Sequence, residues 1–195
     1  MKKLLFITLL GISQTAVFAQ PTNWTVDPVH SSVKFSVSHM TISSVDGLFK
    51  TFSGTMTCPA KDFNNAKINF TIDVNSVSTD NDMRDKHLKS DDFFNAEKYP
   101  NITFVSTSFK KYKANTYMLQ GNLTIRNVTR KVTIPVVYGG TIKDPYGLIR
   151  AGFKGAGKIS RKEYGLLYNK LTEAGGAIVG DEVTFTVNVE VTQQK

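Results

Sequence analysis

Apolar and polar residues alternate with a period of two along most of this 195-residue chain. Val33, Phe35 and Val37, for example, alternate with polar residues. Because successive side chains of a strand point to opposite faces, this pattern predicts a strand with one buried and one solvated face. The same alternation predicts strands over 68–74, 117–125, 132–138 and 183–191, and shorter or glycine-interrupted strands over 24–27, 48–57, 102–109 and 149–159.

Two segments depart from the alternation. Residues 79–94 contain no β-branched residue after Thr79, and Thr79 followed by Asp82 is typical of a helix start, so a short helix is predicted near 82–90. Pro100 then ends any helix and begins the next strand. The glycine-rich stretch 161–180 predicts a loop with a turn or two of helix before the last strand.

An antiparallel array with one apolar face must bury that face, and one short helix cannot cover it. The sheet therefore either doubles into a sandwich or closes into a barrel. Strands of about nine to eleven residues favour an eight-stranded barrel, whose interior is filled by side chains or holds one ligand. Glycines within the predicted strands suit the bends of a curved sheet; these are Gly54, Gly121, Gly152, Gly155 and Gly157. We predict an all-β, eight-stranded antiparallel barrel with one short helix.

The first nineteen residues are typical of an export signal. Lys2 and Lys3 precede an apolar run over 4–12, and Ala19 ends a plausible cleavage site. A membrane anchor would need about 20 uninterrupted apolar residues, and the polar residues 13–15 break the run. We therefore expect a signal peptide over 1–19, a single domain over 20–195, and a periplasmic or secreted protein with no stable membrane anchor.

Charge and composition exclude several other classes. Without Lys2 and Lys3 the chain has 22 basic and 16 acidic residues, a net charge of +6. The densest basic groups, 110–113 and 126–131, fall at predicted strand ends, where solvated charge is ordinary, so no nucleic-acid partner is expected. An apolar fraction of 41% excludes a disordered chain. Cys58 is the only cysteine, which excludes an intrachain disulfide and a cysteine-held metal cluster.

Candidate catalytic and metal-binding residues are few. His30 and Ser31 follow Asp27 and resemble parts of a hydrolase triad, but no G-x-S-x-G motif occurs, and strand neighbours point to opposite faces. The remaining histidines, His39 and His87, form no metal-binding spacing. We therefore predict no catalytic residues, no metal and no cofactor, and we do not expect an enzyme.

Several motifs in a fixed order resemble those of the YceI-like family. They are WTVDPVHS at 24–31, FSVSH at 35–39, GLF at 47–49, RDKHLKSDDFF at 84–94, YPNITF at 99–104, GNLTIR at 121–126, and the glycine-rich stretch 152–165. The resemblance covers nearly all of the chain after the predicted signal. One departure is Asn127, where the family more often has glycine in its turn.

The resemblance implies a lipocalin-like barrel, exported, that encloses an apolar cavity for a polyisoprenoid or another long-chain lipid. Some members of the family are linked to stress responses and to carrying isoprenoid quinones. Apolar residues on the buried faces of the predicted strands and of the segment 84–94 are the candidates for lining such a cavity: Phe35, Val37, Phe49, Phe70, Ile72, Phe94, Phe104, Leu123, Ile125, Phe153, Phe185 and Val187. For any one of them, filling the core is an equally good interpretation.

Polar residues near the cavity mouth would select the head group of a lipid. His39, Arg84 and His87 are the candidates, and Arg84 is the natural partner of a pyrophosphate or carboxylate. The alternative is that Arg84 pairs with Asp85, Asp91 or Asp92 and holds the helix to the barrel. Two other functions stay open, namely a structural or partner-binding barrel filled by its own side chains and an enzyme that acts on a bound lipid. The sequence also leaves a homodimer open.

Overall fold

The computed structural model describes residues 20–59, 62–170, 176 and 178–194. The predicted signal peptide, 1–19, lies outside the described residues, so its presence and cleavage stay predictions. Within the described part no helix is long and apolar enough to cross a membrane.

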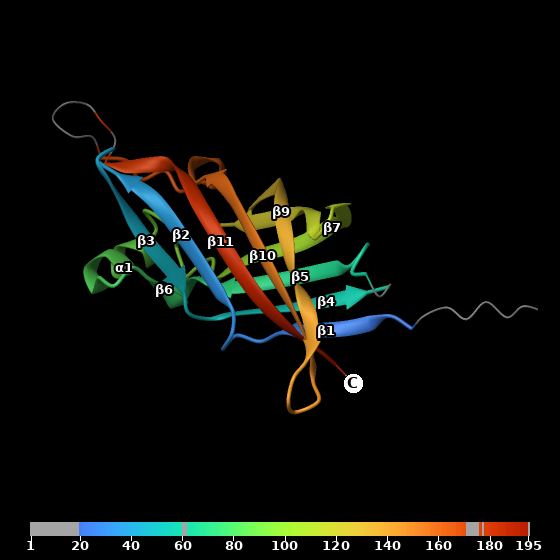
Figure 1. Ribbon diagram of the computed structural model, residues 1–195. Helices are drawn as coiled ribbons and strands as arrows, with labels where there is room; N and C mark the ends of the chain where they lie inside the picture. Colours follow the sequence, from blue (N-terminus) through green and yellow to red (C-terminus); the bar gives the residue numbers. More distant parts are fainter. Residues whose placement is uncertain (1–19, 60–61, 171–175, 177, 195) are drawn as a thin grey trace, which may run out of the picture.

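Strands make up most of the described chain (Figure 1). In order, they are β1 (Thr22–Val26), β2 (Ser32–His39), β3 (Ser43–Phe49), β4 (Phe52–Cys58), β5 (Lys67–Asp73), β6 (Val77–Ser78), β7 (Asn101–Lys113), β8 (Thr116–Ile125), β9 (Val128–Lys143), β10 (Ile149–Ser160) and β11 (Val179–Gln193). The described residues form one α-helix, α1 (Asp82–Lys89), and two 3₁₀ turns, η1 (Val74–Ser76) and η2 (Lys162–Tyr164).

The strands close into the predicted eight-stranded antiparallel barrel. The hydrogen-bonded order is β1-β4-β5-β7-β8-β9-β10-β11, and β11 returns to β1. Along β11, β1 pairs near the C-terminal end and β2 pairs over Val179–Asn188. Both strands run antiparallel to β11, so β1 and β2 together form one interrupted strand beside it. β3 and β4, which pair with β2 and β1, form the next interrupted strand.

Two details of the sequence prediction were wrong. The single strand predicted over 48–57 is interrupted at Lys50 and Thr51, because β3 pairs with β2 and β4 pairs with β1. The helix begins where it was predicted, but its N-cap is Asn81, whose side chain accepts a hydrogen bond from the Arg84 backbone N–H. Thr79 instead donates its hydroxyl to Asp85 Oδ1 at 2.6 Å.

A bulge in β7 changes which residues face the interior. The pairing with β8 shifts between Ser106 and Ser108, so Phe109 points inward and is 1% exposed. Strict alternation from Phe104 would have pointed Phe109 outward. The sequence predicted a bend or bulge at Gly152, and the pairing of β10 with β9 does shift its register between Gly152 and Phe153.

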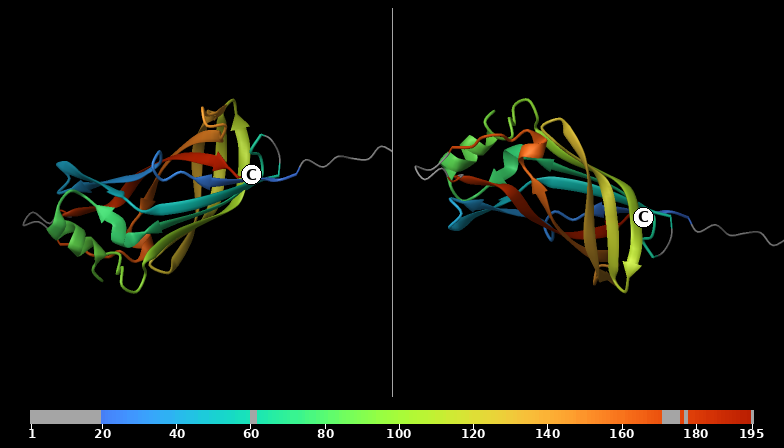
Figure 2. Two further views of the ribbon diagram at one scale, coloured as in Figure 1. Left: turned by 90° about the horizontal axis from the view of Figure 1, so that it is seen from below. Right: turned by 90° about the horizontal axis from the view of Figure 1, so that it is seen from above.

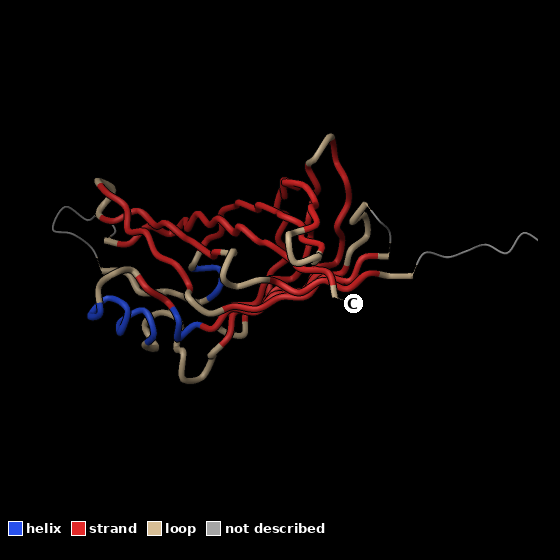
Figure 3. The backbone as a smooth tube through the Cα atoms, turned by 60° about the horizontal axis from the view of Figure 1, so that its bottom comes forward, coloured by secondary structure: helices blue, strands red, loops and turns tan. Residues whose placement is uncertain are grey.

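The two ends of the barrel differ (Figures 2 and 3). One end carries α1, the β2–β3 turn, the β8–β9 turn and η2, and we call it the helix end. The other carries both ends of the described chain, where the Gln194 N–H donates to the Asn23 carbonyl. Six aromatic residues gather inside this second end, which we call the aromatic end: Trp24, Phe63, Phe109, Tyr117, Tyr138 and Phe153.

Candidate functional site: an apolar cavity inside the barrel

The barrel encloses a cavity of about 280 Å³ whose walls are almost wholly apolar. Every strand of the closed barrel contributes side chains to its lining, and so does α1 through Leu88. All twelve residues that the sequence proposed for a lipid cavity line it: Phe35, Val37, Phe49, Phe70, Ile72, Phe94, Phe104, Leu123, Ile125, Phe153, Phe185 and Val187. That they contact a ligand stays a prediction.

Glycines on neighbouring strands make room for the phenylalanine rings of this cavity. Phe35 on β2 is the register partner of Gly47 on β3, and a Cβ added to Gly47 would lie 2.3 Å from Cζ of the ring. Phe185 has the same relation to Gly157, at 2.7 Å. Each ring therefore lies along the barrel wall, over the adjacent strand. At Gly157 the close approach of the Phe185 ring explains the glycine better than the strand bending that the sequence suggested there.

The floor of the cavity is the aromatic cluster. Phe153 contacts Phe63 with ring centroids 5.1 Å apart and Tyr138 at 5.4 Å, and Phe109 stacks on Tyr117 at 4.7 Å. These separations are in the range that aromatic pairs prefer. Phe109 and Phe153 also line the cavity, so the cluster closes the interior at the aromatic end.

At the helix end the cavity is covered by the segments that follow α1 and η2. Leu88, Phe93, Phe94 and Leu166 line it there. Arg126, in the β8–β9 turn, donates from Nη1 to the carbonyls of Phe93 and Gly165, at 2.8 and 2.9 Å. One side chain thus joins the two covering segments to the barrel.

The turn that carries Arg126 has two residues of positive φ. Arg126 has φ +48° and Asn127 has φ +65°, as in the two-residue turns that suit the twist of a hairpin. Asparagine tolerates this left-handed conformation better than most residues, so Asn127 preserves a turn in which glycine is more usual.

The three predicted rim residues do not line the cavity. Arg84 donates from Nε to the Thr79 hydroxyl at 2.7 Å and from Nη2 to the Thr79 carbonyl at 2.8 Å. His87 contacts Asp92 Oδ2 at 2.8 Å and packs edge-on against Phe93 and Tyr168. His39 pairs in the ladder between β2 and β11. Among the described residues Arg84 forms no ion pair with an aspartate. Its partner is Thr79, which neither the head-group interpretation nor the ion-pair interpretation had named.

Arg161, which the sequence did not single out, is the buried charged side chain of the lining. Its side chain is 4% exposed, and its guanidinium donates to three backbone carbonyls of the helix end. Burial lowers its pKa, while the nearby Asp181 charge raises it. Arg161 follows the last residue of β10 and precedes a glycine-containing loop, a position where an arginine is usually solvated, so its burial had no sequence signal.

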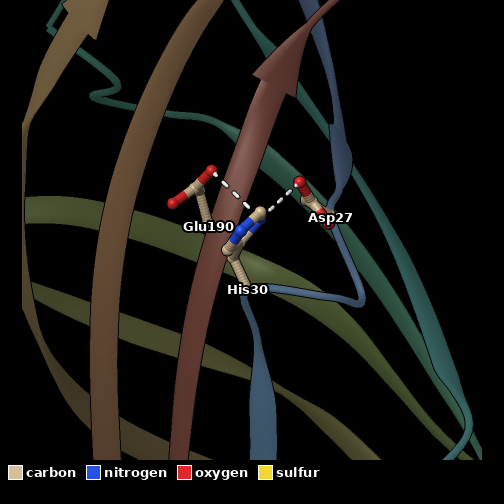
Figure 4. A group of neighbouring side chains, drawn as sticks. All are labelled: Asp27, His30 and Glu190. Atoms are coloured by element: carbon tan, nitrogen blue, oxygen red, sulfur yellow. Dashed lines mark hydrogen bonds and ion pairs between the residues drawn. The ribbon is translucent and has the colours of Figure 1, made fainter. Parts of the chain in front are cut away.

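Asp27, His30 and Glu190 form a charged group on the outside of the barrel (Figure 4). His30 Nδ1 lies 3.0 Å from Asp27 Oδ2 and 3.9 Å from Glu190 Oε1. Hydrogen bonds from His30 and then from Arg150 hold the pKa of Asp27 far below its usual range, and the bond to Asp27 raises the pKa of His30. The carboxylates already have a cation partner, because Arg150 Nη1 donates to Asp27 at 2.7 Å and to Glu190 at 2.6 Å.

This charged group connects the β1–β2 junction to β10 and β11. Arg150 also contacts Asp144, through Nε, at 2.7 Å. Ser31 exchanges hydrogen bonds with the backbone of Glu190, and the structure gives it no bond to His30. A bound metal would compete with the Arg150 cation for the same carboxylates. The arrangement therefore fits a structural ion-pair network better than a metal centre or a hydrolase triad.

Cys58 is the only thiol, and its environment makes it unreactive. It is 1% exposed, and burial raises its pKa to about 11 although a hydrogen bond with Thr22 acts in the opposite direction. Because the thiolate is the nucleophile, a thiol with this pKa stays protonated at neutral pH.

Comparison with known proteins identifies the barrel. The YceI-like domain profile matches residues 24–191. "Protein YceI" of Salmonella newport (strain SL254) is 39% identical over 196 residues, which span 100% of this chain and 99% of that protein. The crystal structure of BcnA from Burkholderia cenocepacia superimposes with a TM-score of 0.73 at 27% identity, over 85% of this chain and 98% of that one.

A more distant structure shares the fold alone. It is a polyisoprenoid binding domain from Saccharophagus degradans implicated in plant cell wall breakdown, with a TM-score of 0.66 and 16% identity over 88% of this chain and 98% of that one. The profile match over most of the chain and the full-length similarity to Protein YceI agree with the motifs found in the sequence. The chain therefore belongs to the YceI-like family.

Proposed function

We propose that this protein holds a polyisoprenoid or another long-chain lipid inside its barrel. The observation that carries the proposal is the apolar cavity of about 280 Å³, a volume just below the range of about 300–1,000 Å³ typical of ligand pockets. Its walls offer hydrocarbon contact on all sides, and its floor is closed by aromatic rings. An apolar tail that enters this space leaves water, which is worth about 0.8 kcal/mol per methylene.

Two comparisons support the same proposal. The chain belongs to the YceI-like family, and a neighbour of the same fold is described as a polyisoprenoid binding domain. The side chains that line the cavity are almost all apolar, which suits the binding of a hydrocarbon tail. The charged group at Asp27 lies on the opposite side of the barrel wall.

We also propose where the protein works. The predicted signal peptide over 1–19 would export the chain to the periplasm or beyond, and the domain would carry, store or sequester its lipid there, with a role in stress as one use. Apolar burial discriminates weakly between tails of similar length, because each methylene contributes alike. The protein would therefore accept several related chains.

Native mass spectrometry of freshly purified protein, followed by organic extraction, tests lipid binding. We expect a co-purifying lipid with a mass that the extract reproduces. Val187→Trp would fill the cavity from β11 and remove the lipid, whereas Thr184→Trp, on the exposed face of the same strand, would leave it bound. A clean unliganded mass, together with no uptake of an added long-chain isoprenoid, would favour a structural barrel and contradict the proposal.

A further inference from the structure

Arg161 is held firmly in one position at the helix end of the cavity. Its guanidinium donates from Nε to the Gly180 carbonyl at 2.8 Å, from Nη1 to the Leu166 carbonyl at 2.6 Å, and from Nη2 to the Val179 carbonyl at 3.1 Å. These bonds use three of the five N–H groups of a guanidinium. The other two make no hydrogen bond to a described residue.

Arg161 forms no ion pair with any carboxylate of the described residues. Of the described carboxylates, none lies within the 4.0 Å of an ion pair with Arg161. Asp181 is near enough to act electrostatically, but its side chain is exposed and accepts hydrogen bonds from the Ser160 hydroxyl and the Lys162 N–H. A guanidinium stays charged at neutral pH, so this cation is buried and has no ion-pair partner among the residues that the structure describes.

Arg150 shows what the same side chain looks like in a structural role. It is more exposed than Arg161, and three carboxylates surround it: Asp27, Asp144 and Glu190. In the described part of the chain, carboxylates thus neutralise the arginine on the outer face, and none pairs with the arginine that lines the cavity. Burying a charge without a partner is unfavourable, and a ligand that supplies the opposite charge offsets that cost.

We propose that Arg161 binds the oxyanion head group of a long-chain lipid, a phosphate, a diphosphate or a carboxylate. This proposal rests on the proposed function, because it assigns a polar subsite to the same cavity. The apolar tail would run from Arg161 toward Phe109 and Phe153 at the aromatic end, which line the cavity floor. Arginine suits this role because its planar fork donates two parallel hydrogen bonds to one oxyanion.

The head-group site therefore lies at Arg161, and the sequence-based candidate Arg84 becomes the natural control. Arg84 is exposed on α1, its guanidinium is held by Thr79, and it does not line the cavity. Both arginines are at the helix end, so removing either changes the net charge of that end by one unit. A general electrostatic effect would appear in both variants, whereas a specific contact would appear only at Arg161.

The test compares three ligands with one tail and different heads: geranylgeranyl diphosphate, geranylgeranoic acid and geranylgeraniol. Their dissociation constants are measured by competition against one fluorescent apolar probe. We expect the wild-type protein to bind at least one of the two anions about ten times or more tighter than the alcohol, as a charged hydrogen bond implies. The anion that binds tighter shows whether the head is a phosphate or a carboxylate.

Variants then locate the preference. In Arg161→Gln we expect the anion-to-alcohol ratio to fall to near one, with the affinity for the alcohol kept, and in Arg84→Gln we expect the ratio to stay at its wild-type value. Arg161→Lys keeps the charge but loses the planar fork, so it should bind the anion with an affinity between those of the wild type and Arg161→Gln. If Arg161→Gln does not fold, Arg161→Lys provides the test in its place. Equal binding of alcohol and anions by the wild type, or a ratio unchanged in both Arg161 variants, would overturn the head-group proposal while lipid binding stands. Failure of all three ligands to bind the wild type would overturn both proposals.

Discussion

The two halves of the barrel interior use the same residue type in opposite ways. At the aromatic end, Phe63, Phe109 and Phe153 meet other rings and fill the space between the walls. In the half nearer α1, Phe35 and Phe185 lie over glycines of the neighbouring strand and leave the centre hollow. Glycines opposite Phe35 and Phe185 thus allow these two rings to lie along the barrel wall, whereas Phe109 and Phe153 pack against other rings.

The largest effect should come from removing a ring in the filled half. Phe153→Ala should lower the free energy of unfolding by about 3–5 kcal/mol, because Phe153 packs against Phe63, Phe109 and Tyr138. Phe185→Ala should cost only about 1–2 kcal/mol, since Phe185 is less buried than Phe153 and its removal loses fewer contacts. Urea unfolding of both variants measures the difference, and equal losses would remove the distinction between the halves.

A second variant separates stability from binding. Arg150→Gln leaves Asp27, Asp144 and Glu190 without their cation, so we expect the free energy of unfolding to fall, though by less than in Phe153→Ala. Because this network lies outside the barrel wall, lipid affinity at a temperature where the variant is folded should not change. A large fall in affinity without a loss of stability would show that the outer network acts on the cavity.

A methyl group added to the cavity wall near α1 should lower lipid affinity more than stability, the opposite of what is expected for Arg150→Gln. Gly47→Ala places a Cβ where the tip of the Phe35 ring lies, so the ring must turn into the hollow. We expect lipid affinity to fall about tenfold, which corresponds to about 1.4 kcal/mol, with a smaller change in stability. Gly152→Ala is the matched control, because an added Cβ there meets no atom within 4 Å. If both variants bind lipid like the wild type, the rings do not set the size of the hollow.

The smallest effect concerns pH. The hydrogen bond with Asp27 raises the pKa of His30, so the stabilisation from charged His30 is complete below its ordinary pKa of about 6.5 and disappears as the pH rises through the raised value. Unfolding free energies measured from about pH 5 to about pH 8.5 should therefore decline slightly more in the wild type than in His30→Gln. His39→Gln should follow the wild type, and an identical decline in all three proteins would contradict the role of His30.

The sequence predicted the barrel because alternation is written into nearly every strand. It predicted the lining for the same reason, since Phe35, Phe70 and Phe185 hold inward positions of regular strands. Phe109 escaped this reasoning because the β7 bulge reverses the alternation just before it. Arg161 escaped because burial of a charged residue depends on three carbonyls of Val179, Gly180 and Leu166, which only the closed fold brings together.

The most direct measurement is a crystal structure of the protein loaded with a long isoprenoid lipid. We predict continuous density for the chain inside the barrel, beside Phe35, Phe70 and Phe185, ending at the rings of Phe109 and Phe153. Density for the lipid only on the outer surface, or an interior filled by the protein's own side chains, would contradict the account.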